Sequence, residues 1–149
     1  MSRVRILGIG SPAGDDQAGW LVVDALLASD AHAGDEVVIE KLDRPGANLI
    51  PQLDGAAWII LVDAMQSNGQ AGRIRRFHQQ DWPGYSQGVS SHGFGVLDAL
   101  SLAQALGSLP SRLDLYGIEM GSVNPDEEAG DSIQAAARQL AKHIAAELR

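Results

Sequence analysis

The sequence contains no cysteine. This excludes a disulfide framework, a zinc site built from thiolates and a cysteine nucleophile. Basic residues are also scarce, since 11 Lys and Arg stand against 19 Asp and Glu, for a formal net charge of −8. Nucleic acid and anionic membrane surfaces are therefore poor partners, because basic side chains must neutralise their negative charge. The acidic balance identifies no partner by itself, and we interpret it as a solubility feature.

Long apolar runs are missing as well. No stretch reaches the roughly 18 apolar residues of a membrane span. The opening residues MSRVRILGIG turn into a glycine loop too early for a signal peptide. We therefore expect a cytoplasmic protein without membrane insertion. The 149 residues, 45% of them hydrophobic, suit a single domain over residues 1–149.

What the sequence does contain is an alternation of strand-like apolar runs and helix-like periodicity. Strands are predicted at Val4–Ile9, Glu36–Leu42, Trp58–Val62 and Leu113–Ile118, with an exposed edge strand at Arg73–His78. Helices are predicted at Asp16–Leu27, Gly95–Leu106 and Ser132–Leu148, with a short one at Asn48–Leu53. Such alternation predicts an α/β fold, a single-domain three-layer sandwich whose mostly parallel twisted sheet has helices on both faces.

Polar residues gather where the predicted strands end. The stretch GIGSPAGDDQAGW after the first strand places Asp15 and Asp16 at the lip of a glycine loop. The third strand, WIILV, ends at Asp63, and a long loop over residues 79–91 leads to His92. Ligands of parallel sheets bind beyond the carboxyl ends of the strands, at the switch point. If the first and third strands flank that point, Asp16, Asp63 and His92 converge there.

Two carboxylates and one imidazole form a donor set that suits a first-row divalent cation. Three protein ligands leave coordination positions open for water or substrate. Without a metal the two carboxylates should repel, so that one of them binds a proton more readily.

Each of these residues also has an ordinary role. Aspartates commonly cap helices or begin turns, and a lone histidine is more often a surface residue than a ligand. We assign helix capping to Asp15 and the site to Asp16. Asp98, which lies six residues beyond His92, is expected to be solvated.

Other chemistries fit the sequence less well. The glycine loop reads G-x-G-x-x-x-G, not the dinucleotide fingerprint G-x-G-x-x-G, and it has no basic residue to offset Asp15 and Asp16 against a pyrophosphate. The Ser-Ser-His sequence at 90–92 lacks a G-x-S-x-G elbow, and no H-E-x-x-H motif is present. A small nucleotide-binding domain is kept as the weakest alternative.

Four stretches together resemble the hydrogenase maturation proteases, endopeptidases that trim the C-terminal tail of nickel-iron hydrogenase large subunits. ILGIGSPAGDDQAG is similar to the opening glycine loop of that family, with its acidic pair. IILVDAM resembles its second acidic motif, SSHGFGVLDAL its histidine motif, and YGIEM a late strand. Carried over residue by residue, the metal-contacting positions of the family fall on Asp16, Asp63 and His92.

This resemblance implies a nickel-dependent, aspartic-type endopeptidase whose partner is the large-subunit precursor. Nickel would be held by that substrate, with another divalent cation possible in the isolated protein. Asp16, Asp63 and His92 would be the catalytic residues as well as the metal contacts, with either a metal-activated water or a carboxylate as base. A non-catalytic metal-site module or chaperone for the large subunit is the alternative.

The sequence also departs from the pattern of that family. Ser11 stands where the family usually has Asn, and Gly93 stands where a polar residue is frequent. LDRPGANL lacks the Gly-Thr pair expected after its Asp, which bears on the choice of substrate.

Overall fold

The protein is described by a computed structural model over residues 2–29, 36–54, 56–66, 70–78, 95–121 and 128–148. One sheet holds the strands in the order β2-β1-β3-β5-β4. The strands are β1 (Ser2–Gly10), β2 (Val37–Asp43), β3 (Ala56–Met65), β4 (Ile74–Phe77) and β5 (Arg112–Glu119). The helices are α1 (Ala18–Ala28), α2 (Leu49–Gln52), α4 (Val96–Ala105) and α5 (Asp131–Glu147), with 3-10 turns η1 (Gly14–Gln17) and η3 (Gly46–Asn48).

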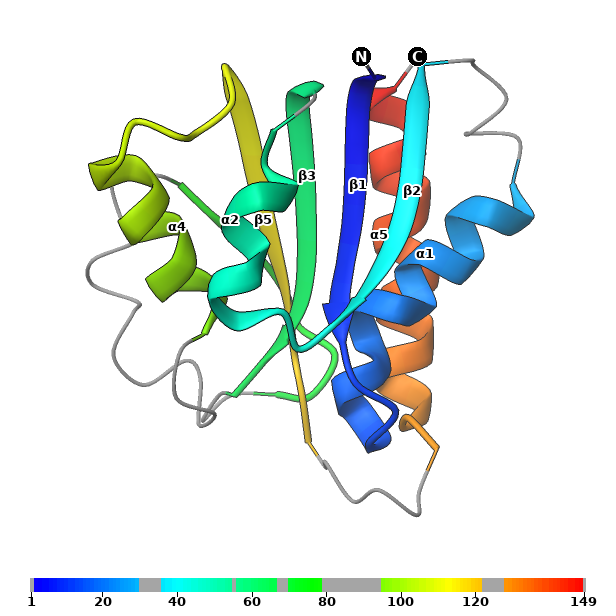
Figure 1. Cartoon of the computed structure of the whole chain (residues 1–149). Helices are drawn as coiled ribbons and strands as arrows, with labels where there is room; N and C mark the ends of the chain where they lie inside the picture. Colours follow the sequence, from blue (N-terminus) through cyan, green and yellow to red (C-terminus); the bar gives the residue numbers. More distant parts are fainter. Residues whose placement is uncertain are drawn as a thin grey trace.

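Helices cover both faces of this sheet (Figure 1). The long helices α1 and α5 contact each other on one face, while α2 and α4 contact each other on the opposite face. β1 pairs in parallel with β2 and β3, and β3 with β5, whereas β4 is an antiparallel edge strand beside β5. The predicted three-layer α/β fold with a mostly parallel sheet is therefore confirmed.

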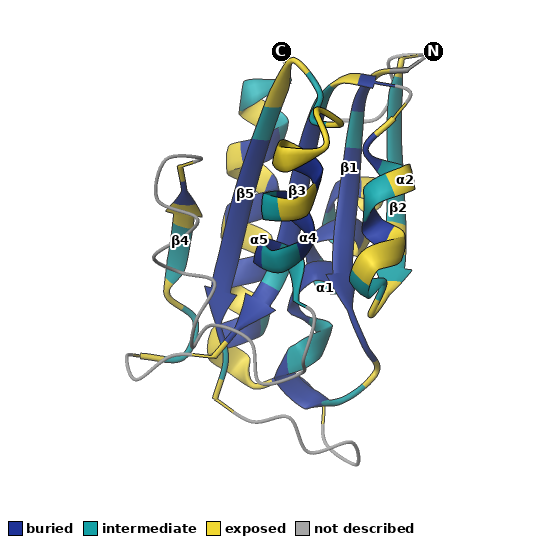
Figure 2. Ribbon diagram, turned by 60° about the vertical axis from the view of Figure 1, so that its left-hand side comes forward, coloured by how far each residue is buried: buried dark blue, intermediate teal, exposed yellow. Residues whose placement is uncertain are grey.

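The central strands are buried along most of their length, as Figure 2 shows, and divide the core into two clusters. Ile60 and Val62 of β3 belong to the cluster under α1 and α5. Leu61 and Met65 belong to the cluster under α2 and α4. Successive side chains of a strand point to opposite faces. Asp63, which lies between Leu61 and Met65, therefore faces the α2 and α4 side.

The predicted elements are present, but two boundaries differ in ways that matter for the site. β3 continues through Asp63 to Met65 because its pairing with β5 extends as far as Met65 opposite Glu119. Asp63 thus lies within the strand and not after it. The first helix begins with the 3-10 turn η1 and becomes α-helical only at Ala18. The whole predicted 79–91 loop lies outside the described residues, and none of the helices described is long and apolar enough to cross a bilayer.

Candidate functional site

The carboxyl edge of the sheet has its topological switch point between β1 and β3. From β1 the chain passes through α1 to β2 on one side, and from β3 it continues to β4 and β5 on the other. The connections leaving the two strands therefore diverge, which is where ligands bind in open α/β sheets. The first and third strands therefore flank the switch point, which is the condition under which the site residues were expected to converge.

Glycines allow the start of α1 to sit directly against the end of β1. A Cβ at Gly8 would overlap the carbonyl oxygen of Gly19, and a Cβ at Gly10 would overlap that of Asp16. Gly14, with φ of +47°, opens the 3-10 turn η1 in the left-handed region that glycine tolerates. The glycine loop is therefore a packing device that brings the Asp16 backbone close to the end of β1.

Asp16 is held by hydrogen bonds from its own loop. The Ser11 hydroxyl donates to Asp16 Oδ2 at 2.5 Å, and the Ser11 backbone N–H donates to the Asp16 carbonyl oxygen at 3.2 Å. The Asp16 N–H in turn donates to the carbonyl oxygen of Ala13 at 2.9 Å. Ser11 is buried and Asp16 is half-buried. The carboxylate is thus oriented locally and is still partly open to solvent.

Asp15 has a role different from the predicted one. Its Oδ2 accepts the backbone N–H of Gly121 at 2.6 Å, and its Oδ1 accepts that of Gly130 at 2.8 Å. Neither η1 nor α1 has a side-chain cap, so the prediction that Asp15 caps the first helix is wrong. A buried carboxylate needs hydrogen-bond donors, and these two distant N–H groups supply one to each of its oxygens.

Asp63 is an acid in an unfavourable environment. Burial, followed by the negative charge of Asp16, raises the pKa of Asp63 from its usual 3.8 to about 8, despite a hydrogen bond from the Ala64 backbone that lowers it. Within the described ranges neither Asp16 nor Asp63 forms an ion pair. The Asp16 charge thus disfavours ionisation of Asp63, and a cation beside the two acids would favour it.

His92, the third predicted site residue, lies outside the described residues. In the part of the chain that is described, no group of three or more His, Asp or Glu side chains could hold a metal ion. The structure thus gives a position to Asp16 and Asp63 of the predicted set. Asp98, expected to be a solvated residue and not a ligand, is half-buried and accepts the Gly95 N–H at 3.0 Å at the start of α4.

Glu119 is a buried acid at the same edge that sequence reasoning did not single out. It ends β5 opposite Met65, two residues beyond Asp63 on the same face of the sheet, and is 2% exposed. Its Oε1 lies 3.8 Å from Nη1 of Arg75, and Oε2 has no hydrogen-bond partner in the described structure. The sequence feature that could have indicated this residue is the position of Glu119 at the end of the apolar strand-like run LYGIE.

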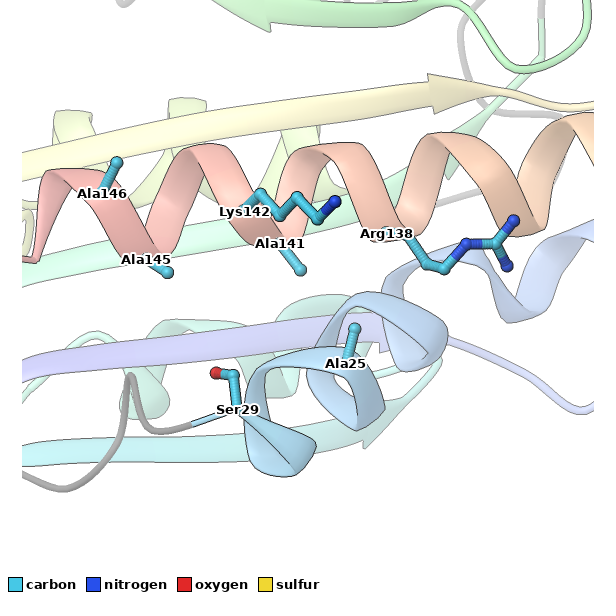
Figure 3. Close-up of a pocket in the computed structure, with 7 residues that line it drawn as sticks. All are labelled: Ala25, Ser29, Arg138, Ala141, Lys142, Ala145 and Ala146. Carbon is cyan, nitrogen blue, oxygen red and sulfur yellow. The ribbon is translucent and has the colours of Figure 1, made fainter.

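A recess elsewhere on the molecule has a different character. Between α1 and α5, a recess of about 360 Å³ is lined by Ala25, Ser29, Arg138, Ala141, Lys142, Ala145 and Ala146. Figure 3 shows Ala141 and Ala145 of α5 facing Ala25 of α1 and Ser29, which directly follows that helix. This lining contains no acid and lies on the face of the sheet opposite Asp63. The paired carboxylates, and not this recess, mark the candidate site.

The fold matches that of known maturation endopeptidases. The chain superposes on the hydrogenase maturating endopeptidase HybD from E. coli with a TM-score of 0.81 at 23% identity, covering 99% of this chain and 92% of that one. It superposes on the [NiFe] hydrogenase maturation protease HycI from Thermococcus kodakarensis KOD1 with a TM-score of 0.74 at 24% identity, covering 99% and 92%. These likenesses define the fold class.

Sequence comparison then assigns the family. The family model described as hydrogenase maturation protease matches residues 36–147, so the chain belongs to the hydrogenase maturation proteases. It is 26% identical to the hydrogenase 2 maturation protease of Escherichia coli (strain K12), over 99% of this chain and 91% of that protein. It is 27% identical to the hydrogenase expression/formation protein HupD of Rhodobacter capsulatus, over 99% and 70%.

The predicted family is thereby confirmed, and the chain is a hydrolase of the endopeptidase class that matures hydrogenases. The chaperone and nucleotide-binding alternatives find no support among these relatives. Asp63 and His92 fall inside the matched range 36–147, whereas Asp16 precedes it and is reached by the full-length relatives.

Proposed function

We propose that this protein removes the C-terminal tail of a nickel-iron hydrogenase large-subunit precursor that already holds nickel. One observation carries the proposal beyond family membership. Asp16 and Asp63, two carboxylates with no ion pair among the described residues, repel each other at the switch point of the sheet. Such an arrangement is costly alone and becomes favourable when a cation arrives with the substrate.

The donor types of the site fit this cargo. Asp16 and Asp63 supply carboxylate oxygens and His92 would supply an imidazole nitrogen, a set that suits divalent nickel. The precursor would hold the ion through its own ligands, so that the protease needs to add only a few. With another divalent cation in solution, the same three side chains would bind it in the isolated protein.

The reaction that the protein catalyses is peptide hydrolysis of the aspartic type. Asp16 and Asp63 are the acid–base groups that accept a proton from the attacking water and return one to the leaving amine. His92 would help to fix the precursor so that the scissile bond lies beside them. We expect this reaction to take place in the cytoplasm.

The test incubates the full chain with nickel-loaded and nickel-free precursor and determines the product masses. The proposal predicts a shortened large subunit with the nickel-loaded form only. Equal processing of the nickel-free form would overturn the nickel dependence. An uncut precursor held in a stable complex would overturn the protease assignment and favour the chaperone alternative.

A further inference from the structure

We propose that Asp15 is a positioning residue of this site, which fastens the loop carrying Asp16 to the two ends of the β5–α5 connection. This inference rests on the proposed function, since it concerns the place where Asp16 meets the nickel-bearing substrate. The two adjacent acids then have different roles. The Asp15 carboxylate accepts hydrogen bonds from two backbone N–H groups, whereas the Asp16 carboxylate remains available to the nickel-bearing substrate.

The Asp15 carboxylate is buried, and its two contacts come from residues distant in sequence. Its side chain is 4% exposed and accepts N–H groups from residues 106 and 115 positions further along the chain. Gly121 follows the end of β5, and Gly130 is the N-cap of α5. Hydrogen bonds to an ionised acceptor are roughly twice as strong as neutral ones. A single carboxylate thus joins three segments at the carboxyl edge of the sheet.

The partners of Asp15 are shaped for this approach. A Cβ at Gly121 would come within 3.3 Å of both Asp15 Oδ2 and the Ala71 Cβ, and a Cβ at Gly130 within 3.6 Å of Oδ1. α5 has no side-chain cap from its own N-cap residue, Gly130. Because Asp15 accepts the Gly130 N–H, its charge lies at the positive N-terminal end of this 17-residue helix. In Figure 1 the start of α5 and the end of β5 lie at the same edge as the start of α1.

The consequence for Asp16 follows from the short turn that the two acids share. η1 has four residues, and the hydrogen bonds given above for Asp16 all come from Ser11 and Ala13 of the same loop. Those local bonds hold Asp16 against the end of β1, but none of them reaches the β5–α5 side of the sheet edge. Asp15 supplies that second restraint, so losing it should displace Asp16 while leaving its local contacts in place.

The decisive variant is Asp15→Asn in the full-length protein. The carboxamide has nearly the same shape but turns an N–H donor toward one of the two backbone N–H groups. We expect kcat for the nickel-loaded precursor to fall about tenfold or more, with KM changed much less, because partners that orient a site typically contribute 10–100-fold. The affinity of the isolated protein for Co²⁺, followed by its visible absorption, should fall about tenfold as well.

Asp114→Asn is the matched control. Asp114 is as buried as Asp15, at 5% exposure, and accepts hydrogen bonds from Trp58, Arg76 and Arg112. It should lower Tm by at least as much as Asp15→Asn without changing kcat or the cobalt absorption. If both variants reduce kcat and cobalt affinity equally, the effect is general destabilisation and the inference is wrong.

A second variant keeps the test decisive if Asp15→Asn does not fold. Gly121→Ala retains the carboxylate but crowds its contact at 3.3 Å, and should reduce kcat in the same direction by a smaller factor. If Asp15→Asn folds with wild-type kcat and cobalt affinity, or if it does not fold and Gly121→Ala has wild-type values, the role of Asp15 alone is overturned. A wild-type chain that leaves nickel-loaded precursor uncut would overturn the proposed function, and the inference with it.

Discussion

Acids at the two ends of this sheet are treated in opposite ways. Asp114, near the start of β5, accepts the Trp58 indole N–H at 2.8 Å and hydrogen bonds from Arg76 and Arg112, and Arg112 lies 3.9 Å from the centre of the Trp58 ring. Asp63, near the end of β3, has no such partners among the described residues, and its pKa is raised to about 8. The fold gives cationic partners to the acid that supports stability and gives none, among the described residues, to the acid beside which a cation is expected.

The neutralised end is also a network. Glu147 of α5 accepts the Tyr116 hydroxyl at 2.7 Å and pairs with Arg112 at 3.2 Å and His143 at 2.9 Å. These contacts tie α5 to β5 through groups that satisfy one another. Such networks stabilise a fold when complete. Substitutions at the two ends of the sheet should therefore have different effects. Those at the carboxyl edge should reduce activity, and those at the opposite end should reduce stability.

The largest expected effect comes from removing the proposed site residues. Asp16→Asn, Asp63→Asn and His92→Ala should each reduce processing of nickel-loaded precursor by about 10²–10⁴-fold, the usual range for acid–base groups. Circular dichroism should show an unchanged fold. Normal processing by two of the three variants would refute the site assignment, and Asp98→Asn, in the first turn of α4, serves as the control that retains activity.

Stability should respond most strongly at the other end of the sheet. Asp114→Ala leaves the Trp58 N–H and two guanidinium groups without their common acceptor, and should destabilise the fold by about 2 kcal/mol, since both arginines are partly exposed. Thermal unfolding measures this loss, while kcat below Tm should stay at the wild-type value. A drop in kcat larger than tenfold in folded protein would contradict the division of labour between the two ends.

The pH dependence of stability should single out Asp63. Its folded-state pKa of about 8 exceeds the usual 3.8, so the folded chain binds more protons between these values. The contribution of Asp63 to metal-free stability is therefore fully present below about pH 4 and is lost as the pH rises through 8. Wild type and Asp63→Asn, unfolded in urea at pH 5 and pH 9, should differ in this slope, with the variant flatter. The same pH dependence of stability in the wild type and in Asp63→Asn would show that the pKa of Asp63 is not raised.

The smallest effect is expected at Ser11. Ser11→Ala removes the hydroxyl donor to Asp16 Oδ2 and should cost about 1 kcal/mol or less in stability. It should lower kcat by a few-fold, because the carboxylate keeps its backbone restraints. Ser11→Asn, which restores a donor, should recover most of that loss. A kcat in Ser11→Ala equal to that of the wild type would show that this hydrogen bond does not orient the acid.

Local patterns in the sequence predicted the strands, the helices and the three layers of the fold, and they predicted that one of two neighbouring carboxylates would hold its proton more readily. They succeeded because alternation and periodicity are short-range properties that determine which face is buried. They failed for Asp15, whose partners lie more than a hundred residues away and are backbone groups without a side-chain signature. They also ended β3 too early, since the extra residues are held in the strand by pairing with β5.

The proton held by Asp63 links two equilibria with opposite slopes. Under the proposed function, arrival of a nickel-bearing precursor expels that proton, so substrate affinity should increase toward alkaline pH. Over the same interval the empty protein loses part of its folding free energy, for the reason given above. Asp63 thereby links both quantities to pH. Acidic pH should weaken binding of the nickel-bearing precursor, and alkaline pH should lower the stability of the unbound enzyme.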